Sequence, residues 1–133
     1  MRLADTSFWI ALAASRDQHH PDAVALWTAQ KEPVVVTNHI AGETWTFLRR
    51  RAGHAAAIAA LEVFRSRRVN LAQVDSKQEA DAWEWLGRHE ERAYSFVDAT
   101  SFVLMRSRRI REALAFGGDF SAAGFVEVRP PGS

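Results

Sequence analysis

The chain has 133 residues, a hydrophobic fraction of 47% and no cysteine, which fits one globular domain and excludes disulfides, thiolate chemistry and cysteine-bound metals. Its uninterrupted apolar runs reach only seven residues, too short for a membrane span of about 20 residues, so we expect a cytoplasmic protein without a membrane partner. The 17 basic residues nearly balance the 16 acidic ones, which by itself argues against a phosphate-binding surface.

The first half of the chain alternates strand and helix patterns. Pro33-Val-Val-Val-Thr37 is the clearest strand, because β-branched apolar residues are typical of a strand that is covered on both faces. Gly53 separates the two helices that follow it. The elements predicted here are a strand and two helices, followed by a second strand and two helices, over residues 2–5, 6–15, 19–31, 33–37, 38–52 and 54–67.

The second half continues the alternation and ends in two short strands. Ser76-x-x-Glu79 has the pattern of a capping box that opens a helix. Gly117-Gly118-Asp119 and a short turn separate the last two strands. The predicted elements are a strand, two helices and two strands, over residues 69–74, 76–92, 95–109, 113–116 and 125–128.

This order of elements predicts a parallel sheet with helices on both faces. Ligands of such folds bind beyond the carboxyl ends of the strands. Side chains that directly follow strands are therefore the first candidates for a functional site.

Two acidic residues occupy such positions: Asp5 ends the first strand, and Asp119 comes after the fourth. A third, Asp98, lies on a predicted helix in the same stripe as Phe102 and Met105. A carboxylate among apolar neighbours loses hydration and needs a cation or several hydrogen-bond donors to stay ionised. Asp98 therefore joins the candidates.

Glu43 is the fourth candidate, at the edge of the apolar arc of the helix over 38–52, beside Phe47. Four carboxylates in one pocket would repel one another unless a divalent cation neutralised them, and oxygen ligands suit Mg²⁺ or Mn²⁺. Such sites often hold two ions, about 3.5 to 4 Å apart, that activate water in phosphodiester hydrolysis.

Each acid also has an interpretation that needs no metal. Asp5 fits a helix N-cap, and Asp98 fits the third position of a capping box with Ser95. Asp119 fits a turn, and Glu43 fits a solvated helix face. Capping does not account for the apolar surroundings of Asp98, so both interpretations stay open.

Four short motifs, in this order, resemble those of the PIN-domain nucleases, in particular the VapC-type toxins of toxin–antitoxin pairs. They are Leu3-Ala-Asp5-Thr-Ser7, the helical Glu43 after the second strand, Ser95-Phe-Val-Asp98-Ala-Thr100 and Phe116-Gly-Gly-Asp119-Phe. The family usually reads Thr-x-Asp where this chain has two glycines before Asp119. The resemblance spans nearly the whole chain and implies a three-layer α/β/α sandwich around a parallel sheet of about five strands. It also implies a single PIN domain over 1–129, and we expect a disordered tail over 130–133.

The resemblance implies a metal-dependent ribonuclease site built from the four acids. Asp5 and Asp98 match the family's Mg²⁺ ligands, for which Mn²⁺ is a substitute, while Glu43 and Asp119 would orient the water or hold a second ion. The supporting hydroxyls are those of Thr6, Ser7 and Thr100.

The implied reaction hydrolyses an RNA phosphodiester and leaves a 3′-hydroxyl and a 5′-phosphate. The implied partners are a small antitoxin protein and a second copy of the chain in a homodimer. Two other functions stay open: a PIN-fold nuclease in RNA maturation or DNA-structure cleavage, and a catalytically silent binding module.

Arginine outnumbers lysine 15 to 2, which suits bidentate contact with phosphates. The candidates for RNA contact are Arg49, Arg50, Arg106 and Arg108, with solvated surface as the alternative. Four of the 16 acidic residues belong to the proposed pocket, which leaves 12 against 17 basic residues on the remaining surface. For the five tryptophans we expect places in the core or at an oligomer interface.

Overall fold

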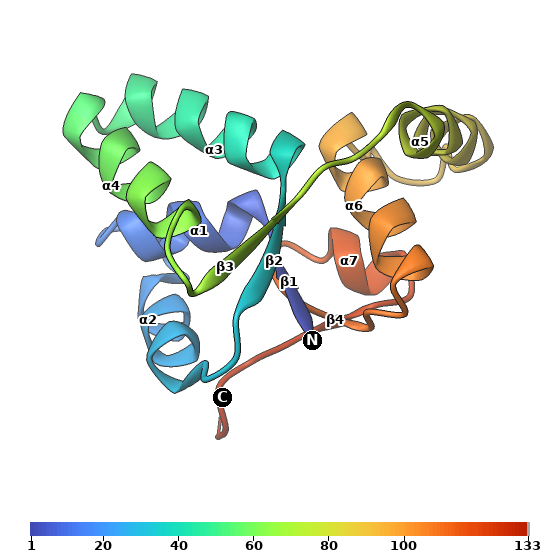
Figure 1. The fold of residues 1–133 in the computed structure, drawn as a ribbon. Helices are drawn as coiled ribbons and strands as arrows, with labels where there is room; N and C mark the ends of the chain where they lie inside the picture. The colour runs from blue at the N-terminus through green and yellow to red at the C-terminus, as the bar shows by residue number, and fades with distance from the viewer. Residues whose placement is uncertain (133) are drawn as a thin grey trace.

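The computed structural model describes residues 1–132, and over this range the chain forms one five-stranded sheet and seven helices (Figure 1). The strands are β1 (Arg2–Ala4), β2 (Val34–Thr37), β3 (Val69–Ala72), β4 (Glu112–Leu114) and β5 (Val126–Glu127). The helices are α1 (Thr6–Ala13), α2 (His20–Ala29), α3 (Asn38–Arg51), α4 (His54–Phe64), α5 (Ser76–Arg88), α6 (Phe96–Ser107) and α7 (Asp119–Ala122).

All strand pairs are parallel, in the order β3-β2-β1-β4-β5. The central strand β1 pairs with β2 through Leu3 and Val35 and with β4 through Leu3 and Ala113. Every side chain of β2 is buried, as its unbroken run of β-branched residues predicts. The central place of β1 puts Asp5 at the middle of the carboxyl edge of the sheet.

Helices cover both faces of the sheet. Figure 1 shows α1 to α4 on one side and α5 to α7 on the other, and the helices pack mainly within these two groups. Large side chains from both groups, such as Phe8, Ile40, Phe102 and Phe120, are fully buried. The predicted three-layer α/β/α sandwich with a five-stranded parallel sheet is confirmed.

Several local predictions are wrong in detail. The capping box of α5 is formed by Asp75 and Gln78, one residue before the predicted Ser76 and Glu79, because the Asp75 side chain accepts from the Gln78 backbone. The predicted turn after Gly118 contains the short helix α7. The helix predicted to run to residue 92 ends at Arg88, which leaves the loop 89–95 free to lie beside the carboxyl edge of the sheet.

Two of the tryptophans differ in burial, and only one of them lies in the core as expected. Trp85 is buried, whereas Trp83 is 60% exposed and stacks on Phe96, with ring centroids 4.0 Å apart. In the predicted tail, residues 130–132 form no helix or strand, and Ser133 lies outside the described residues. Within the described part of the chain, no helix is long and apolar enough to span a bilayer.

Candidate acidic site at the carboxyl edge of the sheet

Asp5 lies at the junction of β1 and α1, where it is the N-cap of α1. Its backbone N–H donates to Leu114 O at 2.9 Å, which joins it to the end of β4. Ser7 donates its backbone N–H (3.2 Å) and its hydroxyl (2.8 Å) to Asp5 Oδ2. The same hydroxyl accepts from the Phe116 backbone at 3.0 Å, so Ser7 links Asp5 to the segment after β4.

Asp5 is only 7% exposed. Burial is the main cause that raises its pKa to about 7, and the negative charge of Asp98 adds to the effect against the hydrogen bonds from Ser7. Within residues 1–132, no cationic side chain forms an ion pair with Asp5. This carboxylate is therefore buried without the counter-charge that a stable buried anion needs.

Asp98 is the third residue of α6 and forms a capping box with Ser95, as the metal-free interpretation predicts. Its Oδ2 accepts from the Ser95 backbone at 3.0 Å, and its own N–H donates to Ser95 Oγ at 3.0 Å. Its pKa is nevertheless raised, first by burial and then by the charges of Asp119 and Glu43. Asp98 is therefore both a helix cap and one of a group of interacting acids.

The four predicted acids lie close enough together for their charges to affect one another. Asp98 interacts with the charges of Asp5, Asp119 and Glu43, although the four lie after β1, on α3, on α6 and at the start of α7. The convergence follows from the topology, since parallel strands send their following residues to one edge.

Asp119, the first residue of α7, forms an ion pair with Arg92. Arg92 Nε donates to Asp119 Oδ1 at 2.7 Å, and Arg92 Nη2 donates to Gly117 O at 2.9 Å. Gly117 and Gly118 both have positive φ, 98° and 91°, which explains why glycine occupies both positions before Asp119.

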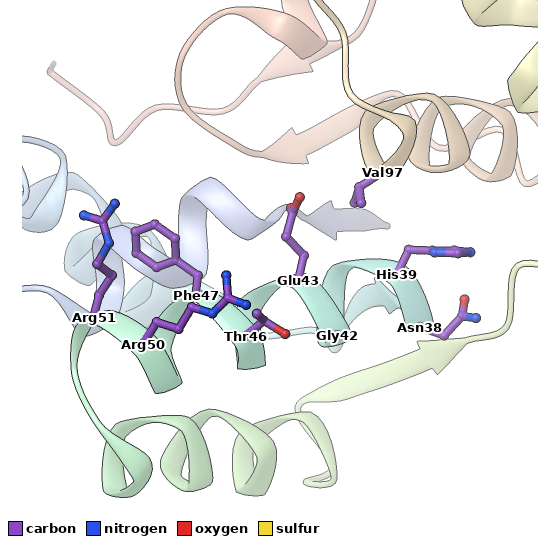
Figure 2. Close-up of a pocket in the computed structure, with 9 residues that line it drawn as sticks. All are labelled: Asn38, His39, Gly42, Glu43, Thr46, Phe47, Arg50, Arg51 and Val97. Atoms are coloured by element: carbon purple, nitrogen blue, oxygen red, sulfur yellow. The ribbon is translucent and has the colours of Figure 1, made fainter.

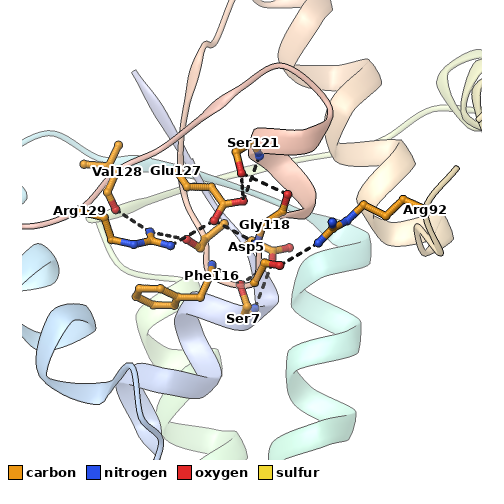
Figure 3. A network of polar contacts seen from close by, with 11 residues as sticks. Asp5, Ser7, Arg92, Phe116, Gly118, Ser121, Glu127, Val128 and Arg129 are labelled. Carbon is orange, nitrogen blue, oxygen red and sulfur yellow. Dashed lines mark hydrogen bonds and ion pairs between the residues drawn. The ribbon is translucent and has the colours of Figure 1, made fainter.

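Glu127 of β5 fixes the loop that carries Asp119 (Figure 3). Its Oε1 accepts from Gly118 N at 3.3 Å and from Arg129 Nη2 at 3.2 Å, and its Oε2 accepts from Ser121 N at 3.0 Å and Ser121 Oγ at 3.2 Å. The Glu127 side chain is 6% exposed, so these bonds compensate a largely buried charge. Neither Arg92 nor Glu127 was predicted as a site residue, because neither belongs to a recognisable local motif.

Glu43 is exposed and lies in a groove of about 670 Å³ between α3 and α6. Figure 2 shows Glu43 extending from α3 toward Val97, with Phe47, Arg50 and Arg51 further along the same helix. The remaining lining residues are Asn38, His39, Gly42 and Thr46. Phe47 is itself 36% exposed, so the buried arc of α3 is narrower than predicted.

The three predicted supporting hydroxyls differ in their hydrogen-bond partners. Ser7 contacts Asp5, as described above. Thr100 Oγ1 donates to Val97 O at 2.8 Å, and Thr6 Oγ1 is buried without a hydrogen-bond partner among the described residues. Of the three, Ser7 alone supports an acid through a hydrogen bond in this part of the chain.

The predicted RNA-contacting arginines are also distributed unevenly. Arg50 lines the groove beside Glu43, and Arg49 precedes it on α3 with an exposed side chain. Arg106 donates to Ala123 O at 3.0 Å and lies over the Phe125 ring, while Arg108 is exposed at the end of α6. Of the four arginines, Arg50 is therefore the one that lines the same groove as a predicted acid, Glu43.

The donor set fits a hard divalent cation. Within the described residues, no three acidic or histidine side chains form a ready-made metal-binding group. Mg²⁺ does not require one, because it is usually held by one or two carboxylates and keeps several waters. Asp5, which is buried and forms no ion pair within residues 1–132, and Asp98, whose charge acts on it, are carboxylates of this chemical type.

Comparisons with known proteins identify the family of the chain. The PIN domain model matches residues 2–126. The 23S rRNA-specific endonuclease VapC20 of Mycobacterium tuberculosis is 58% identical over 131 residues, which are 98% of this chain and 99% of that protein. A VapC ribonuclease of Archaeoglobus fulgidus is 31% identical over 115 residues, 82% of this chain and 72% of that protein.

Similarity extends to a solved structure. The crystal structure of M. tuberculosis VapC20, described as a sarcin–ricin loop cleaving toxin, superposes with a TM-score of 0.94 at 53% identity. The match covers 98% of this chain and 100% of that one.

Proposed function

The chain belongs to the PIN-domain family, and from this premise we propose that it is a VapC-type endoribonuclease, the toxin of a toxin–antitoxin pair. The observation that carries the proposal is the buried Asp5 carboxylate, which forms no ion pair within residues 1–132 and whose pKa is raised further by the charge of Asp98. A carboxylate in that setting fits a metal ligand better than a structural cap, because a cap alone does not require burial of a charge.

In the proposed mechanism, Asp5 and Asp98 would hold Mg²⁺, or Mn²⁺ in its place. When bound, the ion neutralises negative charge at the scissile phosphate and lowers the pKa of water. Ser7 fixes the orientation of the Asp5 carboxylate through its two hydrogen bonds. Asp119 and Glu43, whose charges act on Asp98, would accept a proton or a hydrogen bond from the attacking water, or hold a second ion.

The groove beside Glu43 is the proposed path for the RNA strand. Arg50 and Arg51 supply charges for phosphate contact, and the exposed ring of Phe47, with Arg51 5.2 Å from its centroid, supplies a surface for an unstacked base. By analogy with the M. tuberculosis relative, we propose 23S rRNA and its sarcin–ricin loop as the substrate. A ribosomal substrate would place the reaction in the cytoplasm.

The test is cleavage mapping on total bacterial RNA in the presence of Mg²⁺, with Asp98→Asn as the control. We expect one dominant cut in 23S rRNA, with a 5′-phosphate on the downstream fragment, and loss of that cut in the variant. Cleavage that is unchanged in Asp98→Asn would contradict the proposed site. Absence of any RNA cleavage by the wild-type protein with Mg²⁺ or Mn²⁺ would contradict the function.

We also propose an antitoxin partner and a homodimer. The exposed Trp83 supports an interface, since aromatic residues are enriched where proteins associate. Sedimentation velocity over a range of concentrations tests the dimer, and a single monomeric species at all of them would contradict it. Neutralisation of cleavage by the product of an adjacent small gene tests the antitoxin.

A further inference from the structure

Arg92 lies next to the acids, in the loop 89–95 between α5 and α6. Figure 3 shows Arg92 extending toward the segment that contains Gly118. Its guanidinium donates to the Asp119 carboxylate at 2.7 Å and to Gly117 O at 2.9 Å. Among residues 1–132, it is the cationic side chain that forms an ion pair with one of the four predicted acids. The two bonds hold the guanidinium in a defined place at the edge of the site.

The guanidinium has donors left for a ligand. An arginine side chain offers five N–H groups, and these two hydrogen bonds use two of them. The side chain is 40% exposed, so the remaining donors are accessible from solvent. Exposed ion pairs are weak, so Asp119 does not prevent Arg92 from accepting a second anionic partner.

The backbone beneath Arg92 is shaped for this close approach. A Cβ atom at Gly118 would lie 3.2 Å from Arg92 Nη2, closer than ordinary van der Waals contact. Gly118 also has a φ of 91°, which side-chain-bearing residues rarely adopt. The absence of a side chain at position 118 therefore leaves room for the guanidinium to rest over the loop.

The other arginines near the edge of the sheet are differently committed. Arg129 donates to Ala115 O and Glu127 and lies over the Phe116 ring, and Arg106 donates to Ala123 O beside Phe125. Arg50 lies on α3 beside Glu43. The charges of both Glu43 and Asp119 act on Asp98. Arg50 lies beside Glu43 and Arg92 beside Asp119, so the two arginines come from different elements.

We propose that Arg92 binds a phosphate of the RNA substrate beside the acids while it holds Asp119 in position. The proposal rests on the proposed ribonuclease function and adds a contact to it. An RNA strand that lies in the α3 groove and crosses the acids would then meet a cation on each of two elements. The strand needs such contacts, because the carboxylates themselves repel its phosphates.

The decisive measurement is the salt dependence of RNA binding. Binding of a fluorescein-labelled RNA with the sarcin–ricin loop sequence is followed by anisotropy, without divalent metal and in an Asp98→Asn background that prevents cleavage. Loss of one phosphate contact makes the slope of log K against log salt shallower by about 0.7. For Arg92→Ala we expect that change, together with roughly fivefold weaker binding at 0.1 M salt.

Two variants isolate the contribution of the contact. Arg16→Ala removes the same charge from an exposed position after α1, away from the carboxyl edge, and should leave slope and affinity unchanged. Arg92→Lys should retain the slope, because the charge remains, and also serves if Arg92→Ala does not fold. Melting temperatures of all variants verify folding.

A role limited to orienting Asp119 gives a different result. In that case Arg92→Ala lowers kcat in the otherwise wild-type enzyme but leaves the slope at the parent value, which would overturn the proposal. An Asp119→Ala background sharpens the distinction, because there Arg92→Ala should still weaken RNA binding. If the wild-type protein neither binds nor cleaves RNA, the proposed function fails, and this outcome is distinct from unchanged binding by Arg92→Ala.

Discussion

Asp5 is a buried ionisable residue, and burial disfavours its charged form. The residue is 7% exposed, and burial raises the pKa of its carboxyl to about 7, from 3.8 in a solvated chain. A group with such a shift favours its neutral form in the folded protein, whereas a metal ligand must be ionised. The folded protein is therefore destabilised at neutral pH by a residue that its proposed activity requires.

This conflict predicts a pH-dependent gain in stability from Asp5→Asn. Between about pH 4 and 7, the native protein holds a proton on Asp5 that the unfolded chain has lost, so the free energy of unfolding falls as pH rises and levels off above about 7. The substitution removes this penalty, so we expect the variant to be more stable than the wild type at pH 8, by on the order of 2–4 kcal/mol, and similar at pH 4.

Urea unfolding of metal-free protein between pH 4 and 8 measures this difference. Glu62→Gln is the control, because Glu62 is exposed on α4, and it should show no such trend. Equal stabilities of Asp5→Asn and wild type at pH 8 would show that Asp5 is not destabilising.

Metal binding should offset the destabilisation that the ionised Asp5 carboxylate causes. Mg²⁺ binds the ionised carboxylates, so it should raise the melting temperature of the wild type more at pH 8 than at pH 5. At a concentration 100 times Kd the gain is about 2.7 kcal/mol. Calorimetry with and without Mg²⁺ tests this, and Asp5→Asn and Asp98→Asn should lose the gain together with roughly a hundredfold or more of the cleavage rate. A gain that persists in both variants would place the metal elsewhere.

At the level of elements, the sequence patterns predicted the sheet and the acidic residues that follow its strands. The strand over 33–37 and the alternation of strands and helices led to the parallel sheet, and the carboxyl-edge rule selected Asp5 and Asp119. The contact of Arg92 with Asp119 joins residues 27 positions apart through an irregular loop. Glu127 likewise acts across a turn, on backbone groups of residues 118 and 121. Such contacts depend on loop geometry, which no local period encodes.

The loop before α7 gives a prediction at this scale. Gly118→Ala places a Cβ at a φ of 91° and 3.2 Å from Arg92 Nη2. We expect a loss of about 1–2 kcal/mol in stability and weaker cleavage, because Arg92 must move away from the loop. Gly87→Ala is the matched control: it lies in α5 with no atom near its Cβ, and it should gain roughly 0.5–1 kcal/mol. Urea unfolding and initial cleavage rates measure both, and a Gly118→Ala enzyme as stable and active as wild type would refute the packing described.

For the molecule as a whole, the net charge of +1 conceals an uneven distribution. Negative charge is concentrated where Asp5, Asp98, Asp119 and Glu43 interact, while arginines predominate on the surrounding elements. The total charge is therefore a poor guide to nucleic-acid binding in a protein whose acids gather at one site. Without a metal, the arginines attract an RNA strand and the acidic site repels it.

This opposition predicts that an inactive variant binds RNA more tightly than the wild type when no metal is present. At pH 8, where Asp5 is ionised, Asp5→Asn combined with Asp98→Asn removes two negative charges from the path of the strand. We therefore expect affinity to rise severalfold at 0.05 M salt, an order-of-magnitude figure for charges a few ångströms from a phosphate. The difference should fade toward 1 M salt, where the Debye length is about 3 Å.

Divalent metal should act in the same direction on the wild type alone. Ca²⁺, added as a hard cation, neutralises the acids that the double variant already lacks, so the two proteins should converge in affinity. Anisotropy titrations of one labelled RNA with both proteins, at several salt concentrations and with or without Ca²⁺, measure the effect. Weaker binding by the double variant at low salt would mean that the acids do not face the bound strand.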